Sequence, residues 1–261
     1  MAIVTVLKDE EAVGAAAAER LTSLIDASSS ARGSAIVCLT GGRTPRRLYE
    51  RLADASQPWR SRIVWPGVHA FWGDERHVPP DHPESNFGMA HRALLAHVPI
   101  PAHQVHRIRG ELPDAAAAAR EYEHILPGTF DIVLLGLGED AHIASIFPGS
   151  PLLERGGSDP LHESTQGVES SHEGGLTPLV AAVWAAPLNA WRITLTPPAL
   201  LDARAILVIV SGGNKAPAVR AALDGPMDLT RVPAHLLRAA GDRVEWIIDA
   251  AAARLRGAPP A

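Results

Sequence analysis

Four polar or glycine-rich segments of the chain contain the groups that could bind anions or move protons. Each follows an apolar run, and the segments are Thr40–Pro45, Gly73–Arg76, Gly136–His142 and Ser211–Lys215. If the apolar runs are parallel strands, their carboxyl ends meet at one edge of a sheet, which is where such sheets bind ligands. We therefore expect the four segments to form one site.

His142 is the residue best suited to act as a general base. It follows a buried strand-like run and the acidic pair Glu139 and Asp140. A neutral imidazole accepts a proton near neutral pH, and a neighbouring carboxylate can orient its ring. Two other interpretations fit the same residues: Asp140 caps a helix that begins at His142, or the two residues form an Asp-x-His metal pair. Because no motif supplies a further ligand, we expect no metal.

The first segment is suited to binding phosphate. Gly41, Gly42, Arg43 and Thr44 stand directly before Pro45, where we expect a helix to open. The free N–H groups at a helix start point the same way as the helix dipole, and together they favour an anion. The alternative is an ordinary strand-to-helix turn in which the glycines only supply unusual dihedral angles.

Other charged residues could complete a positive pocket in this acidic chain. Arg76 could contact a carbonyl or phosphate oxygen and Asp74 could orient the imidazole, although their charged string taken alone favours a solvated loop. Arg192 begins an alternating strand-like run, and Lys215 opens an expected helix. Such residues are most often surface charges. Together with Arg43 and Arg76, however, they would provide the positive surroundings that a phosphorylated ligand requires.

The composition and the missing motifs exclude several classes of function. The net charge of −5 gives no basic surface for nucleic acid or an anionic membrane. No stretch approaches the ~20 apolar residues of a membrane span, and the first residues lack the pattern of a signal peptide. The sequence contains no Gly-x-Ser-x-Gly elbow and no dinucleotide fingerprint. Base-catalysed attack by water, or proton transfer, on a sugar phosphate remains.

The lone cysteine indicates a cellular compartment rather than a catalytic role. Cys38 lies inside the apolar run Ala35–Leu39 and has no adjacent base. A free, buried cysteine suits a reducing environment. We therefore predict that the protein is cytoplasmic.

Strand-like and helix-like segments alternate along the chain. We expect strands at 3–7, 35–39, 68–72, 131–135, 205–210 and 244–248, and a first helix that ends near Ile25, before a break at Ser28–Gly33. The alternation predicts an α/β fold: an open, mostly parallel, Rossmann-like sheet with helices on both faces. We expect one domain over 1–261, with a flexible insertion at 152–178, where hydrophobic periodicity is absent.

Motifs along nearly the whole chain resemble, in order, those of the 6-phosphogluconolactonase family. They are Leu39–Pro45, Trp72–Pro79, Ser85–Asn86, Leu135–Gly149, Arg192–Thr196 and Gly213–Ala216. The resemblance implies hydrolysis of 6-phospho-D-glucono-1,5-lactone to 6-phosphogluconate, the second step of the oxidative pentose phosphate pathway. It also implies an α/β/α sandwich, the fold shared with glucosamine-6-phosphate isomerases and deaminases.

The resemblance also assigns roles to residues. It makes His142 the base that activates water for attack on lactone C1, with Asp74 or Asp140 holding the imidazole. Arg76 would stabilise charge on the carbonyl oxygen. The residues implied to face the phosphate or to add anion contacts are Gly41, Gly42, Arg43, Thr44, Arg192 and Lys215. On this scheme the partner is a small sugar-phosphate lactone, no metal or organic cofactor takes part, and no motif indicates an oligomeric state.

Glucosamine-6-phosphate deaminases supply the main alternative. They resemble the chain at Asp140–Ala144, and Ile143 is closer to their pattern than to the threonine usual in lactonases. They carry a glutamate where this chain has Phe147 and a tyrosine where it has Arg76, and their amine chemistry needs that extra acid. A catalytically inactive relative that binds sugar phosphates is a third alternative.

The chain departs from the family pattern in two places. Ala141 stands where both groups usually have glycine, so we expect either a hindered backbone approach to the substrate or a strained positive φ. The segment 152–178 is longer than is usual in the family. It would then cover the site or only decorate it.

Overall fold

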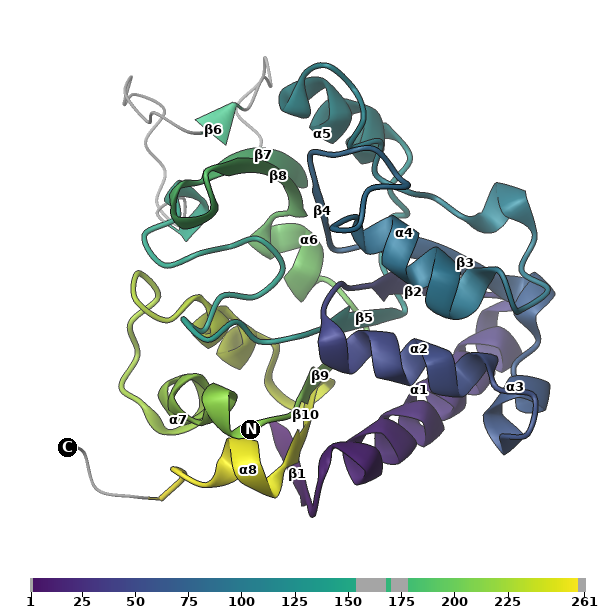
Figure 1. The fold of residues 1–261 in the computed structure, drawn as a ribbon, viewed down its shortest axis with the longest axis horizontal. Coiled ribbons are helices and arrows are strands. Elements are labelled where there is room, and N and C mark those ends of the chain that lie inside the picture. The colour runs from purple at the N-terminus through teal and green to yellow at the C-terminus, as the bar shows by residue number, and fades with distance from the viewer. Residues whose placement is uncertain (1, 154–167, 170–177, 258–261) are drawn as a thin grey trace.

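The computed structural model describes residues 2–153, 168–169 and 178–257, and its strands form two sheets (Figure 1). The larger sheet has six parallel strands in the order β1-β10-β9-β5-β2-β3. Its strands are β1 (Ile3–Leu7), β2 (Ala35–Leu39), β3 (Val68–Trp72), β5 (Ile132–Leu135), β9 (Ala205–Val210) and β10 (Val244–Asp249). These bounds closely match the predicted apolar runs, because a strand covered on both faces must be apolar throughout.

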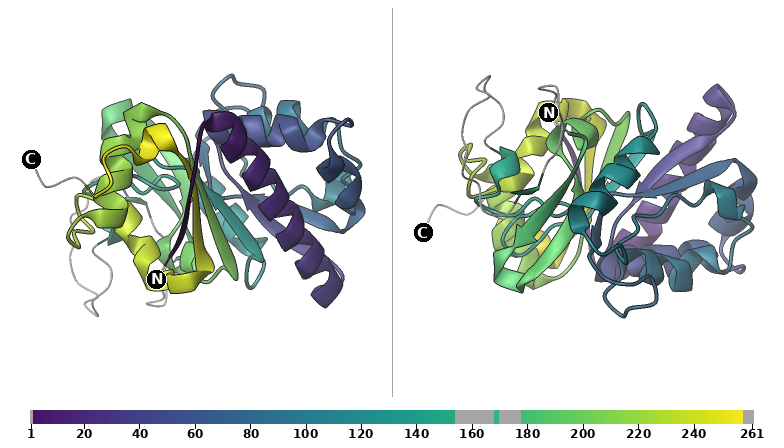
Figure 2. Two further views of the ribbon diagram at one scale, coloured as in Figure 1. Left: turned by 90° about the horizontal axis from the view of Figure 1, so that it is seen from below. Right: turned by 90° about the horizontal axis from the view of Figure 1, so that it is seen from above.

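Helices cover both faces of this sheet, as predicted. The α-helices are α1 (Glu10–Arg32), α2 (Arg43–Ala53), α3 (Pro58–Arg62), α4 (Asn86–Ala90), α5 (Ala115–His124), α6 (Pro197–Leu201), α7 (Ala216–Asp224) and α8 (Ala250–Ala253). A π-helical turn at His91–Leu95 extends α4, and 3₁₀ turns lie at Trp65–Gly67, Ala102–Gln104, Pro151–Leu153, Ala186–Leu188, Gly213–Lys215 and Pro233–Arg243. Figure 2 shows α1 and α2 on one face and α7 and α8 on the other. The buried hydrophobic side chains form one cluster between these layers.

A second, antiparallel sheet was not predicted. Its order is β4-β8-β7-β6, with β4 at Asp74–Arg76, β6 at Val168–Glu169, β7 at Val180–Ala185 and β8 at Ala190–Leu195. Helix α5 packs against β7 and β8. The expectation of a solvated loop at Asp74–Arg76 is therefore wrong, because pairing with β8 turns this charged string into a strand.

Glu75 explains how a charged strand is accommodated. Its buried carboxylate accepts hydrogen bonds from the backbone N–H groups of Asn86 and Phe87, both at 2.7 Å, and from Ser85 Oγ at 3.0 Å. These donors belong to the start of α4. Burial raises the pKa of Glu75, and the backbone hydrogen bonds oppose that rise.

The first helix is longer than predicted. The expected break at Ser28–Gly33 is wrong, because α1 continues to Arg32 with Ser28 buried on its inner side. The helix stops at Gly33, which adopts a left-handed φ of 81° that glycine tolerates.

The two tyrosines of the chain, Tyr49 in α2 and Tyr122 in α5, are both buried, and their hydroxyls reach the ends of β2 and β3. Tyr49 Oη accepts a hydrogen bond from the N–H of Thr40 (3.0 Å) and donates one to its carbonyl (2.9 Å). Tyr122 Oη does the same for Trp72, at 2.7 and 2.9 Å. Buried backbone groups must be paired. Each phenol pairs the N–H and the carbonyl of one residue at the end of a strand, so the chain can leave the sheet there without an unpaired backbone group.

Two further expectations concern the chain as a whole. The insertion predicted at 152–178 falls largely on residues outside the described ranges. Within the described ranges, no helix is both long enough and apolar enough to cross a bilayer.

Candidate active site

The four segments singled out in the sequence line one cavity of about 730 Å³. They reach it from the carboxyl ends of β2, β3, β5 and β9. The lining includes Thr40–Pro45, Asp74, Arg76, Gly136–Asp140, His142, Ser211, Asn214 and Lys215, together with Asn86, Ala144, Phe147, Leu188, Ile209 and Val210. The convergence follows from parallel topology, which places the ends of all these strands at one edge.

His142 and Asp140 form a hydrogen-bonded pair at this cavity. The distance from His142 Nδ1 to Asp140 Oδ1 is 2.6 Å. An ionised carboxylate can only accept, so Nδ1 carries the proton and Nε2 keeps a free lone pair. Burial raises the pKa of Asp140, but the hydrogen bond and charge of His142 outweigh it, so the pKa lies below its usual value. The pair therefore has the arrangement of a general base and its orienting group.

The imidazole also packs on an aromatic ring. The ring centroids of His142 and Phe147 are 4.5 Å apart with an interplanar angle of 45°. One face of the imidazole is thus covered by an apolar side chain.

The predicted helix at His142 is wrong: residues 139–150 form turns instead. Ala141 has φ = 64° and Ala144 has φ = 48°, both in the left-handed region. Each such residue costs about 1–2 kcal/mol when it carries a Cβ, and it interrupts a right-handed helix. We expected either a hindered backbone approach to the substrate or a strained positive φ at Ala141, and the structure has the positive φ.

Gly138 lets the loop backbone pass against the pair. A Cβ at this position would overlap both the imidazole of His142 and the carboxylate of Asp140. Any side chain here would displace the two groups, so glycine is required by close contact.

Asp74 does not hold the imidazole. Its Oδ2 accepts a hydrogen bond from Ser145 Oγ at 2.7 Å, and its Oδ1 accepts one from Asn86 Nδ2 at 3.2 Å. Of the two carboxylates expected to orient His142, the structure gives that contact to Asp140. Asp74 is still part of the cavity wall.

The first and fourth segments contact each other where they line the cavity. Gly42 is the residue before α2, and Thr44 Oγ1 lies 2.8 Å from Ser211 Oγ. Arg43 Nε is 3.7 Å from Glu10 Oε1, and Ser211 Oγ donates to the same oxygen at 3.2 Å. Glu10, in the first turn of α1, was missed by the sequence reasoning, since no motif marks it.

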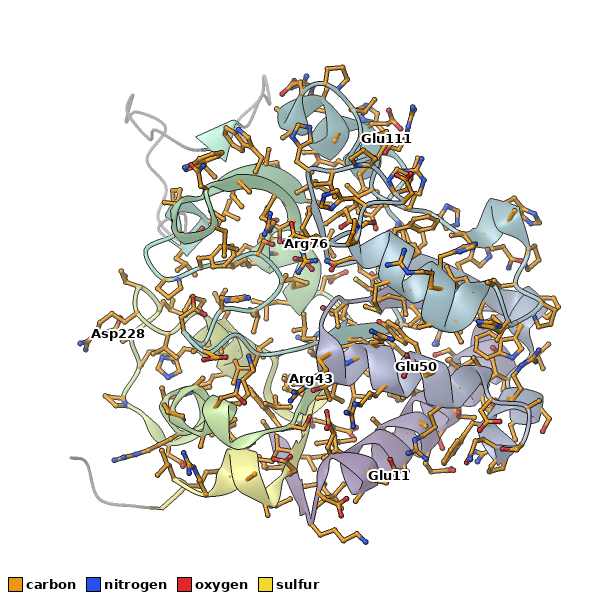
Figure 3. The ribbon with its side chains drawn as sticks, viewed as in Figure 1. Glu11, Arg43, Glu50, Arg76, Glu111 and Asp228 are labelled. Carbon is orange, nitrogen blue, oxygen red and sulfur yellow. The ribbon has the colours of Figure 1, made fainter. Side chains whose placement is uncertain are left out.

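Arg43 and Arg76 both lie near the middle of the view, whereas Asp228 lies at its edge (Figure 3). Arg76 lines the cavity and donates to the backbone carbonyl of Glu84. Lys215, half-buried, also lines the cavity, and its burial lowers its pKa despite the nearby Glu139 and Asp140.

Arg192 is placed differently from the other cations. It pairs in register with Arg76 across β4 and β8, and the residue is 7% exposed. Burial lowers the pKa of Arg192, and the neighbouring charge of Arg76 lowers it further. Among the described residues that line the cavity, Arg192 is absent.

Two asparagines contribute contacts that the residue types alone did not indicate. Asn86 fills the space beside Gly41, where a Cβ would overlap its side chain. Asn214 Nδ2 donates to Glu139 Oε1 at 2.8 Å and so connects the third and fourth segments. Both stand in the motifs of the family resemblance, which was the available signal.

The metal interpretation of Asp140 and His142 requires further ligands. In the part of the chain that the structure describes, no group of three or more His, Cys, Asp or Glu side chains is placed to hold a metal ion.

Comparison with known proteins gives a family match. The family described as glucosamine-6-phosphate isomerases/6-phosphogluconolactonase matches residues 8–246. The chain belongs to this family. The family resemblance inferred from the motifs is confirmed, and every residue that lines the cavity lies within the matched range.

Relatives from the glucosamine-6-phosphate isomerase/6-phosphogluconolactonase family match nearly end to end. The 6-phosphogluconolactonase of Mycobacterium tuberculosis is 39% identical over 265 residues, covering 96% of each chain. That of Nostoc is 34% identical over 259 residues, covering 95% of this chain and 96% of the relative. The solved 6-phosphogluconolactonase of Trypanosoma brucei has a TM-score of 0.76 at 27% identity, covering 97% of this chain and 98% of that one.

Proposed function

We propose that the chain hydrolyses 6-phospho-D-glucono-1,5-lactone to 6-phosphogluconate, the second step of the oxidative pentose phosphate pathway. The observation that carries the proposal is the Asp140–His142 pair, which opens onto a cavity whose lining also includes the N-terminus of α2, Arg43 and Lys215. A base and anion-binding groups in one cavity fit a phosphorylated ester. The named lactonase relatives support the same reaction.

The chemistry begins at the free nitrogen of His142. Nε2 takes a proton from water as the water oxygen bonds to lactone C1, and the C1 carbonyl electrons move onto its oxygen. Asp140 holds Nδ1–H and stabilises the imidazolium that forms. Arg76 stabilises the oxyanion.

Collapse of this intermediate opens the ring. The carbonyl re-forms, the bond from C1 to the ring oxygen breaks, and the proton on Nε2 passes to that oxygen, which becomes the 5-hydroxyl. The new carboxylic acid loses its proton to solvent, and His142 returns to its neutral form. Each atom of water is thus accounted for, and the scheme uses no metal or organic cofactor.

The phosphate would lie at the first segment. The N–H groups of Gly41, Gly42, Arg43 and Thr44 converge near the start of α2, where the helix dipole also favours an anion. Lys215 adds a charge from the fourth segment. We propose that Arg192, which lies beside Arg76 rather than in the lining, strengthens the positive potential from behind the cavity wall.

Phe147 favours the lactonase over the deaminase. It packs on the imidazole at the position where deaminases resemble the chain but carry a glutamate. Among the described residues, the acid hydrogen-bonded to His142 is Asp140. The second acid that amine chemistry would need is replaced by an apolar ring.

We also propose a cytoplasmic location. Cys38, the one cysteine of the chain, is free and buried, as in proteins of reducing compartments.

The test is a coupled assay on freshly generated lactone, with the spontaneous hydrolysis rate as the baseline. Wild type should accelerate the loss of lactone, and His142→Ala should abolish the acceleration. His97→Ala, an exposed histidine outside the cavity lining, is the matched control and should retain the full rate. A chelator should leave the wild-type rate unchanged.

Two results would overturn the proposal. Release of ammonia from glucosamine 6-phosphate without lactone hydrolysis would assign the deaminase reaction. Binding of 6-phosphogluconate in calorimetry, with turnover of neither compound, would identify an inactive sugar-phosphate-binding protein.

A further inference from the structure

The loop that carries His142 is held by turn hydrogen bonds rather than by a helical ladder: the His142 carbonyl accepts from the N–H of Gly138 at 2.9 Å, and the His142 N–H donates to Asp140 Oδ1 at 3.2 Å. Left-handed residues stand on both sides of the histidine, at Ala141 and Ala144, so the helical ladder that would fix its backbone cannot form. Strained backbone of this kind persists only where surrounding groups hold it. The groups that fix the position of the imidazole must therefore come partly from outside the loop.

Ser145 is attached to the second sheet at two points. Its hydroxyl donates to Asp74 Oδ2 at 2.7 Å, and its backbone N–H donates to Thr194 Oγ1 at 3.2 Å. Asp74 and Thr194 are partners in register on the neighbouring strands β4 and β8. The two strands thus present two adjacent acceptors to a residue that lies three positions after His142.

The polarity of this network is fully determined. Thr194 Oγ1 donates its proton to the carbonyl of Leu195 at 3.0 Å, which leaves its lone pairs for Ser145. The two carboxylate oxygens of Asp74 accept from Ser145 Oγ and from Asn86 Nδ2. Exposed fractions of 7% for Asp74, 2% for Ser145 and 0% for Thr194 keep competing water away. Buried, fully satisfied networks of this kind specify one conformation.

We propose that Asp74 is a positioning residue that acts through Ser145 to hold His142 in line with the lactone carbon. The inference rests on the proposed function and deepens it. The left-handed alanines leave the loop without a helical ladder. Asp74, which belongs to the second sheet, supplies part of the missing support by binding Ser145. It orients His142 through three residues of backbone, whereas Asp140 orients it through the ring.

A positioning role predicts loss of turnover rather than of binding. Asp74 contacts Ser145 of the loop that carries His142, while the proposed anion-binding groups come from the first and fourth segments. A displacement of about 1 Å at a reacting group costs on the order of 10²-fold in rate. We expect Ser145→Ala to lower kcat by about 10- to 100-fold, with KM and the Kd of 6-phosphogluconate within about twofold of wild type.

Matched variants separate this role from a general loss of packing. Ser145→Thr keeps the hydroxyl and should restore kcat to within about threefold of wild type. Ser150→Ala removes another buried hydroxyl, which contacts only the N–H of Leu152 at 3.4 Å among the described residues, and should leave kcat unchanged.

Asp74→Asn tests the carboxylate itself. An amide cannot accept from both Ser145 and Asn86, so this variant should lower kcat as Ser145→Ala does. Both changes break the same contact between Asp74 and Ser145. The kcat of the double variant should therefore lie within about threefold of the kcat of either single variant. Asp131→Asn is the control: this carboxylate is 4% exposed and binds Arg32 and Arg204 beyond the cavity lining. It should lower the melting temperature and leave kcat unchanged.

The outcomes distinguish this inference from the proposed function. If wild type does not accelerate lactone hydrolysis, the proposed function fails. The positioning is then tested alone by ¹⁵N spectra of the His142 imidazole. Its signal is assigned as the one that is lost in His142→Ala. Ser145→Ala should replace the single Nδ1–H tautomer with a mixture, and Ser150→Ala should not. If the lactonase is active, unchanged kcat in Ser145→Ala overturns the inference. Multiplying losses in the double variant would show that Asp74 acts directly on the substrate.

Discussion

The two sides of the cavity are built on different kinds of backbone. The anion-binding side, Thr40–Pro45 and Ser211–Lys215, consists of strand ends that lead into helical turns at Arg43 and Gly213. The catalytic loop, residues 136–149, follows β5 as a series of turns with left-handed alanines. Both begin at the same edge of the same sheet, so topology alone does not account for the difference.

The difference reflects what each side must present. An anion is bound by N–H groups that a regular helix start already exposes, so no strain is required there. A general base needs one nitrogen in one place, and its loop reaches that place through unfavourable dihedral angles held by outside contacts. The anion side should therefore govern affinity and the catalytic loop turnover.

The largest effect should come from Asp140→Asn. The amide cannot favour the Nδ1–H tautomer or the imidazolium as the carboxylate does, so we expect kcat to fall by about 10²- to 10⁴-fold. The Kd of 6-phosphogluconate should not change. Stopped assays on fresh lactone and calorimetry measure the two quantities, and a matching loss of affinity would break the division between the sides.

Arg43→Ala should show the opposite pattern. Loss of a charge-assisted contact to phosphate should raise KM by about 10- to 100-fold with kcat nearly unchanged. Arg46→Ala, three residues further along α2, removes an exposed arginine that pairs with Glu50 and provides the control. Equal effects of the two substitutions would mean that general charge, rather than a phosphate contact, sets KM.

The pH dependence of product affinity should report Lys215. Burial lowers the pKa of Lys215, so its charge is lost on raising the pH before the value of about 10.4 typical of free lysine. The Kd of 6-phosphogluconate should then increase by about three- to tenfold as the pH rises towards that value. In Lys215→Arg the affinity should stay constant over the same range, and a persisting transition would assign the titration to another group.

The smallest expected effect is on stability. Ala141→Gly relieves a left-handed residue and should raise the free energy of unfolding by up to about 1 kcal/mol, after the entropy of the extra glycine is subtracted. Ala117→Gly within α5 should instead lower it by about 0.5–1 kcal/mol. Chemical denaturation of both variants measures the difference in sign. Destabilisation by Ala141→Gly beyond the loss of its buried methyl group, about 0.8 kcal/mol, would show that the catalytic loop is not under strain.

The same contrast explains what the sequence could predict. The anion-binding side follows from apolar runs that end in glycine and arginine, because the run sets the strand and the strand sets the edge. The turns around His142 were predicted as a helix, since the residues Ala141–Phe147 carry no proline or glycine to prevent one. Their positive φ angles depend on packing that becomes visible only in three dimensions.

The second sheet was hidden for a related reason. Asp74–Arg76 has no apolar pattern, and its strand exists because β8 supplies the hydrogen-bonding partner and the start of α4 receives Glu75. The contact from Asp74 to Ser145 spans 71 positions of sequence, so local spacing cannot indicate it. Arg43, Arg76 and Lys215 line the cavity as expected, whereas Arg192 does not. The different contacts of Asp74 and Asp140 depend on the fold.

The two helix tyrosines that bond to the ends of β2 and β3 give the chain a built-in optical probe. Burial raises the pKa of Tyr49 and of Tyr122 well above the ordinary value of about 10, and the chain contains two tyrosines in all. In alkali the folded protein should therefore remain silent in the ultraviolet absorbance of tyrosinate. The absorbance should rise only when these two strand ends unfold. An alkaline titration would therefore report the unfolding of the sheet edge that carries the proposed active site.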